Sequence, residues 1–478
     1  MQKENTENTH KTNYNQLRTN YLNSVINSKY SKEILPSETS NPNYSKEKED
    51  KENKAFEIFD NHLQNNIKTI TSTFISDPNN NLSSERTKDF YKLIKQMPKG
   101  GLLHCHLLGA GNPNQLAELA INDENTYYDP NLQILKLLKK GEEIPKNFEK
   151  VSTNSKNINE LFIFTKKDSE QQNYWEVFGR KFVNIYTITS NSKYLKKHLI
   201  NLFQECVDNG VSILQGRFNV GLSRNYDTLE FMPIESECDI FVEALEEFKK
   251  TYPYFTFNVI FTMLKVMIKD ELTNNLNKFI KLKNNEKYKD LLLGFDLVGD
   301  ESLVTSDTFT GTLLDFKEKH PEIVYFLHGG ENYFESNTNV IDNILAETPR
   351  IGHGINIIKH SYLFNTIKEK NICIESCPLS NQRLNYVDNL QHHPLKVYLN
   401  YGLKVCVNSD DNSLFNTTIL NDDFYVCGAL MNFTLLDFKQ VCYNSIVYSC
   451  INKDQIEKHL KKWENDWNEY IDKVINFK

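Results

Sequence analysis

The feature that most constrains this chain is a short apolar run that ends in polar side chains and recurs along the sequence. In the clearest example, residues 324–331 (VYFLHGGE), an apolar β-branched and aromatic run leads into His328, two glycines and Glu331. Such runs are typical of strands that are buried on both faces of a parallel sheet. Polar residues at their C-terminal ends indicate an α/β enzyme, because these folds place their chemistry at the carboxyl ends of the strands.

Five further segments repeat this design, each an apolar run that ends in His, Asp, Glu, Ser or Cys. They are GLLHCH at 101–106, LLLGFDLVGDE at 291–301, RIGHG at 350–354, ICIESCP at 372–378 and VCVNSDD at 405–411. A closed parallel barrel would bring these strand ends to one face. The sequence therefore predicts a cluster of imidazoles and carboxylates, which we interpret as a metal site.

Eight strand-like segments alternate with helical patterns and predict a (β/α)₈ barrel of the TIM type. We expect strands at residues 101–106, 211–218, 255–264, 291–297, 324–327, 350–354, 372–376 and 405–409. Such a barrel takes about 250 residues and tolerates long insertions. The rest of the 478 residues would therefore be additions to one large domain.

The additions can be placed by composition. Residues 1–50 are rich in Asn, Ser, Lys and Glu, which predicts a mostly disordered leader with a short helix at 14–28. Apolar residues at helical spacing predict N-terminal helices within 51–96. The barrel then takes residues 97–478, with an insertion at about 110–160 that is too polar for barrel strands.

The net charge and the cysteine pattern indicate which partners and which cellular compartment to expect. The net charge is −8 without a basic stripe, so we expect no nucleic-acid partner. Nine cysteines, none in a CxxC pattern, favour a reducing compartment. The polar N-terminus has no signal-like apolar core, and no run of about 18 apolar residues predicts a membrane helix. We therefore expect a cytoplasmic protein without membrane contact.

Each polar motif has a simpler explanation when it is taken alone. His104 and His106 alternate along a strand and point to one side, which is a usual start to a zinc site, although an isolated HxH is more often a chance pair. His328 would supply a third imidazole or a hydrogen-bonded core residue. Asp410 and Asp411 would be a helix N-cap pair, which is the commoner use, or Asp410 would be an anionic ligand.

Their joint position at strand ends favours the metal site, with Glu331 and His353 as acid–base groups. The H-x-E and P-C-x-x-C signature of cytidine-type deaminases is absent. A binuclear site remains open through Asp300 and Glu301. The pair His392 and His393 before Pro394 is interpreted as a helix start.

These motifs resemble the adenosine deaminase family. The matching segments keep the family's order and similar spacing from about residue 90 to the C-terminus: MPKGGLLHCH (97–106), GFDLVGDE (294–301), HGGE (328–331), RIGHG (350–354), SCPLSN (376–381) and NSDD (408–411). The first of these motifs, CPLSNQ and the long insertion look most like the adenosine deaminase-related growth factors. That subgroup is typically secreted, so an extracellular location is the alternative.

The resemblance implies one Zn²⁺ per chain and a set of roles. The zinc ligands would be His104, His106, His328 and Asp410. The resemblance also implies that Glu331 donates a proton to purine N1, that His353 activates and orients the attacking water, and that Asp411 and the Gly299 amide bind N7 and N3. Asp410 counts among the catalytic residues, and Trp175 is a candidate for stacking on the purine, although packing is its commoner use.

The implied reaction is zinc-dependent hydrolysis of adenosine or 2′-deoxyadenosine to inosine or deoxyinosine and ammonia. Leu107 and Leu108 stand where relatives carry an aspartate, and Asn412 replaces a usual proline. The alternatives are therefore a deaminase of AMP or of a 5′-substituted adenine nucleoside, or a growth-factor-like binding protein with weak activity. The expected partners are a purine nucleoside and a second copy of the chain, paired through the N-terminal helices.

Overall fold

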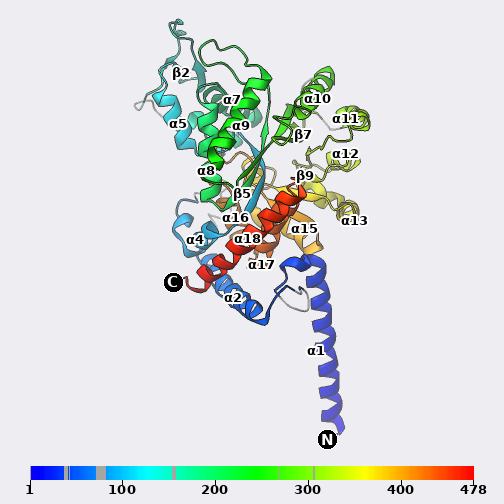
Figure 1. Ribbon diagram of the computed structural model, residues 1–478. Helices are drawn as coiled ribbons and strands as arrows, with labels where there is room; N and C mark the ends of the chain where they lie inside the picture. The colour runs from blue at the N-terminus through cyan, green and yellow to red at the C-terminus, as the bar shows by residue number, and fades with distance from the viewer. Residues whose placement is uncertain are drawn as a thin grey trace.

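Eight parallel strands form the centre of the protein (Figure 1). The computed structural model describes residues 2–36, 41, 43–70, 82–152, 158–266, 269–304 and 307–477. One sheet has the order β1-β5-β6-β7 and the other the order β11-β10-β9-β8. Their bounds are β1 Gly100–His106, β5 Val211–Phe218, β6 Thr256–Leu264, β7 Leu292–Val298, β8 His328–Gly329, β9 Arg350–His353, β10 Cys373–Ser376 and β11 Lys404–Val407.

The two sheets meet at isolated parallel bridges. Cys105 pairs with Asp410 between β1 and the end of β11, and Phe295 pairs with Tyr325 between β7 and the run that precedes β8. The strands therefore follow one another in the order of a (β/α)₈ barrel, which confirms the predicted fold class, although single bridges replace continuous ladders at these two seams.

The fifth strand is the one whose position differs from the prediction. The run at 324–327 pairs with β7 only around Phe295, whose N–H donates to Val324 O and whose carbonyl accepts from Phe326 N, both at 2.9 Å. Regular pairing with β9 is limited to His328 and Gly329. The strand as hydrogen-bonded therefore begins at the polar end of the apolar run.

Helices form the outer layer and pack their apolar faces on the strands (Figure 1). They are α7 Tyr174–Thr189, α8 Leu195–Asp208, α9 Ile234–Lys249, α10 Lys269–Lys283, α11 Asp307–Lys319, α12 Asn339–Leu345, α13 Phe364–Glu369, α14 Pro378–Arg383, α15 Leu395–Tyr401, α16 Asn421–Met431, α17 Leu435–Val447 and α18 Lys453–Ile475. None of the described helices combines the length and apolar content that a membrane crossing needs.

The segment after β1 builds a small unit of its own. It holds helix α5 (Pro113–Asn122) and an antiparallel sheet of β2 (Thr126–Asp129), β3 (Ile134–Leu137) and β4 (Glu149–Lys150), followed by α6 (Lys166–Ser169). The carboxylate of Asp123 ties this unit to the barrel, because it accepts from Tyr194 Oη at 2.5 Å and from Tyr226 Oη at 2.6 Å. The boundaries of the predicted insertion remain a prediction.

The N-terminal segment differs from the predicted disordered leader. Residues 2–29 form helix α1 (Gln2–Lys29), which projects from the body in Figure 1. Tyr30, Ile34 and Leu35 are buried, and Tyr30 Oη donates to Asp437 at 2.9 Å. These three apolar residues of the leader pack on the barrel, whereas the apolar side chains of α1 from Leu17 to Ile26 are exposed. Helices α2 (Lys46–Thr69) and α4 (Asp89–Gln96) follow, and α2 begins five residues before the expected helical region of residues 51–96.

Replacing Gly294 by alanine tests the seam between β7 and the run before β8. A Cβ at Gly294 would lie 2.4 Å from the Val324 carbonyl oxygen and 2.6 Å from the Phe326 ring. We expect Gly294→Ala to lower the free energy of unfolding by about 1–3 kcal/mol through overpacking. Gly311 on α11 is the matched control, because a Cβ there meets no atom within 4 Å. Gly311→Ala should leave stability unchanged or raised. Equal urea-unfolding midpoints for the two variants would contradict this account of the seam.

Candidate active site

Four histidines and an aspartate from four strand ends converge at one end of the barrel. The His104 ring lies 4.6 Å from His328 and 4.7 Å from His353, measured between ring centroids. Asp410 Oδ1 lies 3.3 Å from His106 Nε2 and 3.6 Å from His104 Nε2. The structure therefore brings together the residues that the sequence placed at strand ends.

The donor atoms of this cluster fit a cation. Among the described residues, His104 Nε2 and Asp410 Oδ1 are buried and have no hydrogen-bond partner. His104 and Asp410 lie within 4.8 Å of each other in one potential ligand group, and His104 and His328 do so in another. Imidazole nitrogens with one carboxylate are ligands that Zn²⁺ takes. Cys377 and Asp411 also approach this centre.

A second layer of charges orients two of the imidazoles. His104 Nδ1 lies 2.8 Å from Glu375 Oε2, and His328 Nδ1 lies 2.7 Å from Asp296 Oδ2. Each bond assigns the ring hydrogen to Nδ1 and leaves Nε2 free as a ligand. The orientation of both rings therefore depends on where the two carboxylates are held.

One guanidinium holds both carboxylates. Arg217 on β5 donates from Nε to Asp296 Oδ2 at 2.6 Å and from Nη2 to Glu375 Oε2 at 2.8 Å. All three side chains are fully buried, and Arg350 donates to the other oxygen of Glu375. Sequence reasoning missed these four residues. The available signal was a charged residue inside each apolar strand, which does not reveal its partner.

Burial sets the protonation of the cluster. It lowers the pKa of His104, His106, His328 and His353 well below the usual value. The Arg217 cation lowers the pKa of all four rings further, and neighbouring imidazoles do so for His104, His106 and His353. The rings are therefore neutral, as metal ligands must be.

Glu331 differs from the other carboxylates near the centre. Burial, with the charges of Glu301 and Asp410, raises its pKa well above the usual value. Its Oε1 lies 3.5 Å from His353 Nε2, and its backbone N–H donates to Glu301 Oε2 at 3.0 Å. Glu301 in turn pairs with Lys265 at 2.9 Å, so its carboxylate supports the Glu331 loop. The raised pKa favours the protonated form of the Glu331 carboxyl group.

Of the three residues predicted to contact a base, Asp411 lies at this centre with His106 and Asp410. Asp411 is buried, and its Oδ1 has no hydrogen-bond partner among the described residues. Gly299 follows β7 with a φ of +106°, which suits glycine. Trp175 on α7 is half-buried, and its Nε1 donates to Tyr386 Oη at 3.1 Å. Burial and then the charge of Glu331 raise the pKa of Tyr386, which places this aromatic pair near the acid.

Leu107 and Asn412, two of the positions where the sequence departs from the family pattern, have defined contacts in the structure. A Cβ at Gly216 would lie 2.1 Å from Leu107 Cδ2, so the Leu107 side chain covers this glycine. Gly216 faces the side of β5 opposite to Arg217, and Leu107 therefore points away from the histidine cluster. Asn412 accepts from Gly111 N at 3.1 Å and donates to Gly111 O at 3.0 Å, contacts that a proline side chain cannot make.

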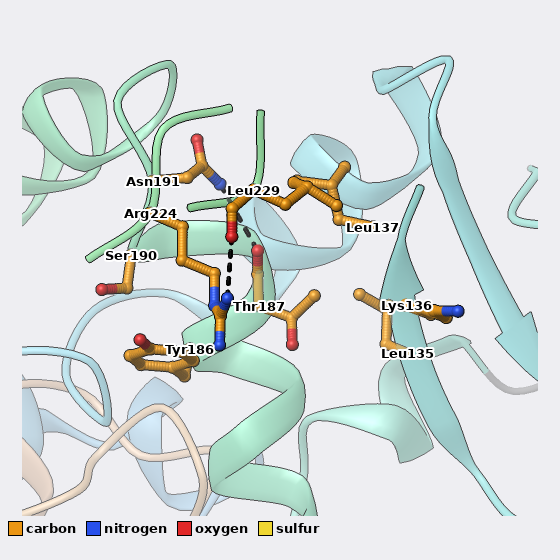
Figure 2. Close-up of a pocket in the computed structure, with 9 residues that line it drawn as sticks. All are labelled: Leu135, Lys136, Leu137, Tyr186, Thr187, Ser190, Asn191, Arg224 and Leu229. Carbon is orange, nitrogen blue, oxygen red and sulfur yellow. Dashed lines mark hydrogen bonds between the residues drawn. The ribbon is translucent and has the colours of Figure 1, made fainter. Parts of the chain in front are cut away.

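A cavity of about 200 Å³ lies elsewhere, between β3, the C-terminal end of α7 and the loop after β5 (Figure 2). Leu137, Asn191 and Arg224 are among its walls, and none of its lining residues belongs to the histidine cluster. This cavity is therefore no part of the site described above.

Comparison with known proteins gives concordant matches. The family model described as adenosine deaminase matches residues 139–464. A Dictyostelium discoideum protein named adenosine deaminase 2 is 28% identical over 463 residues, which cover 89% of this chain and 83% of the relative. The structure of adenine deaminase from Arthrobacter aurescens aligns with a TM-score of 0.60 at 20% identity, over 78% of this chain and 99% of that one. An amidohydrolase from Burkhoderia ambifaria with bound Zn aligns with a TM-score of 0.61 at 16% identity, over 80% and 94%.

Removing the Lys265 cation tests the support of the Glu331 loop. Lys265→Met leaves Glu301 buried without its ion pair, and we expect the free energy of unfolding to fall by about 3–5 kcal/mol. Lys281 makes the same type of contact, at 3.0 Å to Glu235, on an exposed surface. Lys281→Met is therefore the matched control and should change stability little. Chemical denaturation compares the two, and an equal effect would contradict a supporting role for the buried pair.

Proposed function

Because this chain belongs to the adenosine deaminase family, we propose that it hydrolyses adenosine or 2′-deoxyadenosine to inosine or deoxyinosine and ammonia. The observation that carries this proposal is the position of a buried carboxyl group, Glu331, beside His353 and the imidazole–carboxylate cluster. A neutral acid next to a metal-type ligand set suits the addition of water to a protonated purine.

One Zn²⁺ is proposed for the cluster, with His104, His106, His328 and Asp410 as its ligands. Support comes from the neutral rings, the partnerless Nε2 and Oδ1 atoms, and the zinc bound by the related amidohydrolase. A bound zinc supplies Lewis-acid activation of the attacking water. Ser380 Oγ donates to Asp410 Oδ2 at 2.7 Å and so leaves Oδ1 directed at the centre.

Glu331 is proposed as the general acid. A purine C6 becomes more electrophilic when N1 takes a proton, so the group facing N1 must arrive protonated. Burial and two neighbouring carboxylates raise the pKa of Glu331 and supply that state. The link from the Glu331 N–H to Glu301 and Lys265 fixes the loop that carries the acid.

The remaining roles concern the water and the base. His353 is proposed to orient the attacking water, Asp411 to bind N7, the Gly299 amide to bind N3 and Trp175 to lie against the purine. The role of Asp411 is supported by its Oδ1 atom, which is buried and has no hydrogen-bond partner among the described residues. Burial and the neighbouring Asp410 raise the pKa of Asp411, so it can present an O–H donor to N7.

Replacing Glu331 by glutamine tests the reaction and the acid together. We expect wild type to hold about one zinc and to consume adenosine, followed by the loss of its ultraviolet absorbance. Glu331→Gln should keep its zinc and lose about 10²–10⁴-fold in kcat, because an amide cannot deliver the proton. Glu335 lies exposed in the same loop, so Glu335→Gln is the matched control and should retain activity.

Two outcomes would redirect the proposal. A Glu331→Gln variant with wild-type kcat would remove the acid role. A wild type that binds zinc but leaves adenosine unchanged would point to AMP or 5′-methylthioadenosine, which should be assayed in parallel. Activity on neither compound would favour the growth-factor-like binding protein.

A homodimer through the N-terminal helices is also proposed. Leu17, Tyr21 and Val25 lie four residues apart as a stripe on one face of helix α1 and are 61%, 71% and 39% exposed. Leu22 and Ile26 are also exposed, but they lie on other sides of the helix. Two such stripes can cover each other in a symmetric pair of helices. The projection of α1 from the body leaves that face accessible (Figure 1).

Charge placed on this stripe should separate the subunits. We expect wild type to show the mass of a dimer by light scattering, and Leu17→Glu with Val25→Glu to show a monomer of 55.8 kDa. Asn20→Glu with Asn27→Glu places the same charges outside the stripe, on exposed positions, and should remain dimeric. A stripe variant that keeps the dimer mass would exclude α1 as the interface.

A further inference from the structure

A line of hydrogen-bonded groups leads from the start of helix α15 to the His353 ring. The Leu395 N–H donates to His393 Nδ1 at 3.2 Å. His393 Nε2 lies 3.2 Å from Asn381 Oδ1, and Asn381 Nδ2 lies 3.1 Å from His353 Nδ1. The three side chains are buried, with His393 4%, Asn381 0% and His353 1% exposed. Their contacts are therefore made with one another and not with solvent.

Each contact in this line has one direction. A backbone N–H only donates, so Nδ1 of His393 is an acceptor. Burial lowers the pKa of His393 to about 3, and the neutral ring carries its one hydrogen on Nε2. That hydrogen is donated to Asn381 Oδ1, which turns the amide so that its NH₂ group faces His353. The amide nitrogen donates, and Nδ1 of His353 therefore accepts.

We infer that His393, acting through Asn381, is a positioning residue that holds neutral His353 in the tautomer with its hydrogen on Nε2. This is the opposite of His104 and His328, whose Nδ1 atoms face carboxylates. The sequence motif at 392–394 thus has a use beyond starting a helix. One exposed and one buried histidine stand side by side there, and only the buried one joins the line.

The His353 Nε2–H points into the reaction centre. Nε2 lies 3.5 Å from Glu331 Oε1 and 3.9 Å from Asp410 Oδ2, and it has no hydrogen-bond partner among the described residues. With its hydrogen on Nε2, the His353 ring can donate a hydrogen bond to an oxygen atom placed between Glu331 and Asp410. The same nitrogen cannot accept a proton. His353 therefore orients the attacking water and stabilises the negative charge that develops on its oxygen.

The chemical consequence rests on the proposed deaminase function. The water oxygen forms its bond to C6 while one water proton passes to Asp410, the carboxylate left to accept it. The Glu331 proton passes to N1, and the proton held by Asp410 then passes to the amino group, so that the C6–N bond breaks and ammonia leaves with the bonding electron pair removed from C6. The hydroxyl proton on C6 returns to Glu331 as the C6 carbonyl forms. His353 donates a hydrogen bond throughout and exchanges no proton.

An isosteric change at Asn381 tests the tautomer. The carboxylate of Asn381→Asp can only accept, so it should draw the His353 hydrogen to Nδ1. Long-range ¹H–¹⁵N spectra of the full chain, labelled at histidine and stripped of metal, report which ring nitrogen carries the hydrogen. We expect Nε2–H in wild type, Nδ1–H in Asn381→Asp and both forms in His393→Phe, where the amide loses its donor. His392→Phe, at the exposed neighbour, is the matched control and should match wild type.

Kinetics of the metal-loaded enzyme give the second measurement. With the hydrogen on Nδ1, His353 loses its donor to the attacking oxygen, and kcat for adenosine should fall by about 10²–10³-fold in Asn381→Asp. KM should change little, because the Asn381 side chain is engaged by His353 and His393. A wild-type His353 with its hydrogen on Nδ1 would overturn the inference. An unchanged kcat in a variant whose tautomer has reversed would overturn its catalytic part. An inactive wild type that keeps Nε2–H would instead remove the proposed function and leave the tautomer assignment standing.

Discussion

The guanidinium of Arg217 is the contact on which the rest of the centre depends. It bonds the carboxylates that orient His104 and His328, and it also donates to the backbone carbonyls of Leu103 and Phe326 at 3.2 Å. These partners belong to both four-stranded sheets, whose strands are joined to each other by isolated backbone bridges at Cys105–Asp410 and Phe295–Tyr325. A buried ion pair adds little net stability over apolar packing, but loss of one partner is costly because it leaves an uncompensated charge. The main effect of this network is therefore to hold the His104 and His328 rings in place, and its net contribution to stability is small.

Burial makes the chemistry of the site possible. Desolvation lowers the pKa of the imidazoles and so keeps them neutral, and it raises the pKa of Glu331 and so keeps its carboxyl group protonated. The two pKa values therefore move in opposite directions from one cause. Segments outside the barrel strands supply part of this burial. Helix α7 places Phe182 6.3 Å from the His106 ring and Trp175 beside Tyr386. Helix α7 is thus part of the wall that buries the site.

The prediction of fold from sequence succeeded where a pattern depends on local physics. Buried parallel strands need continuous apolar runs, and all eight runs were found, with only the fifth displaced to His328 and Gly329. The convergence of His104, His106, His328, His353 and Asp410 followed from the barrel topology. The burial of Tyr30, Ile34 and Leu35 was not predicted, because these side chains lose contact with solvent only against the folded barrel.

The sequence by itself determined the strand order, the face of the barrel that carries chemistry and the residue types gathered there. Each of these follows from periodicity and from which side chains end each strand. Only the tertiary structure decided which charges support which imidazoles, which ring nitrogen of His353 carries its hydrogen, and that Leu107 faces Gly216. These depend on contacts between residues far apart in the chain, and a hydrogen bond has a direction only once both of its partners are in place.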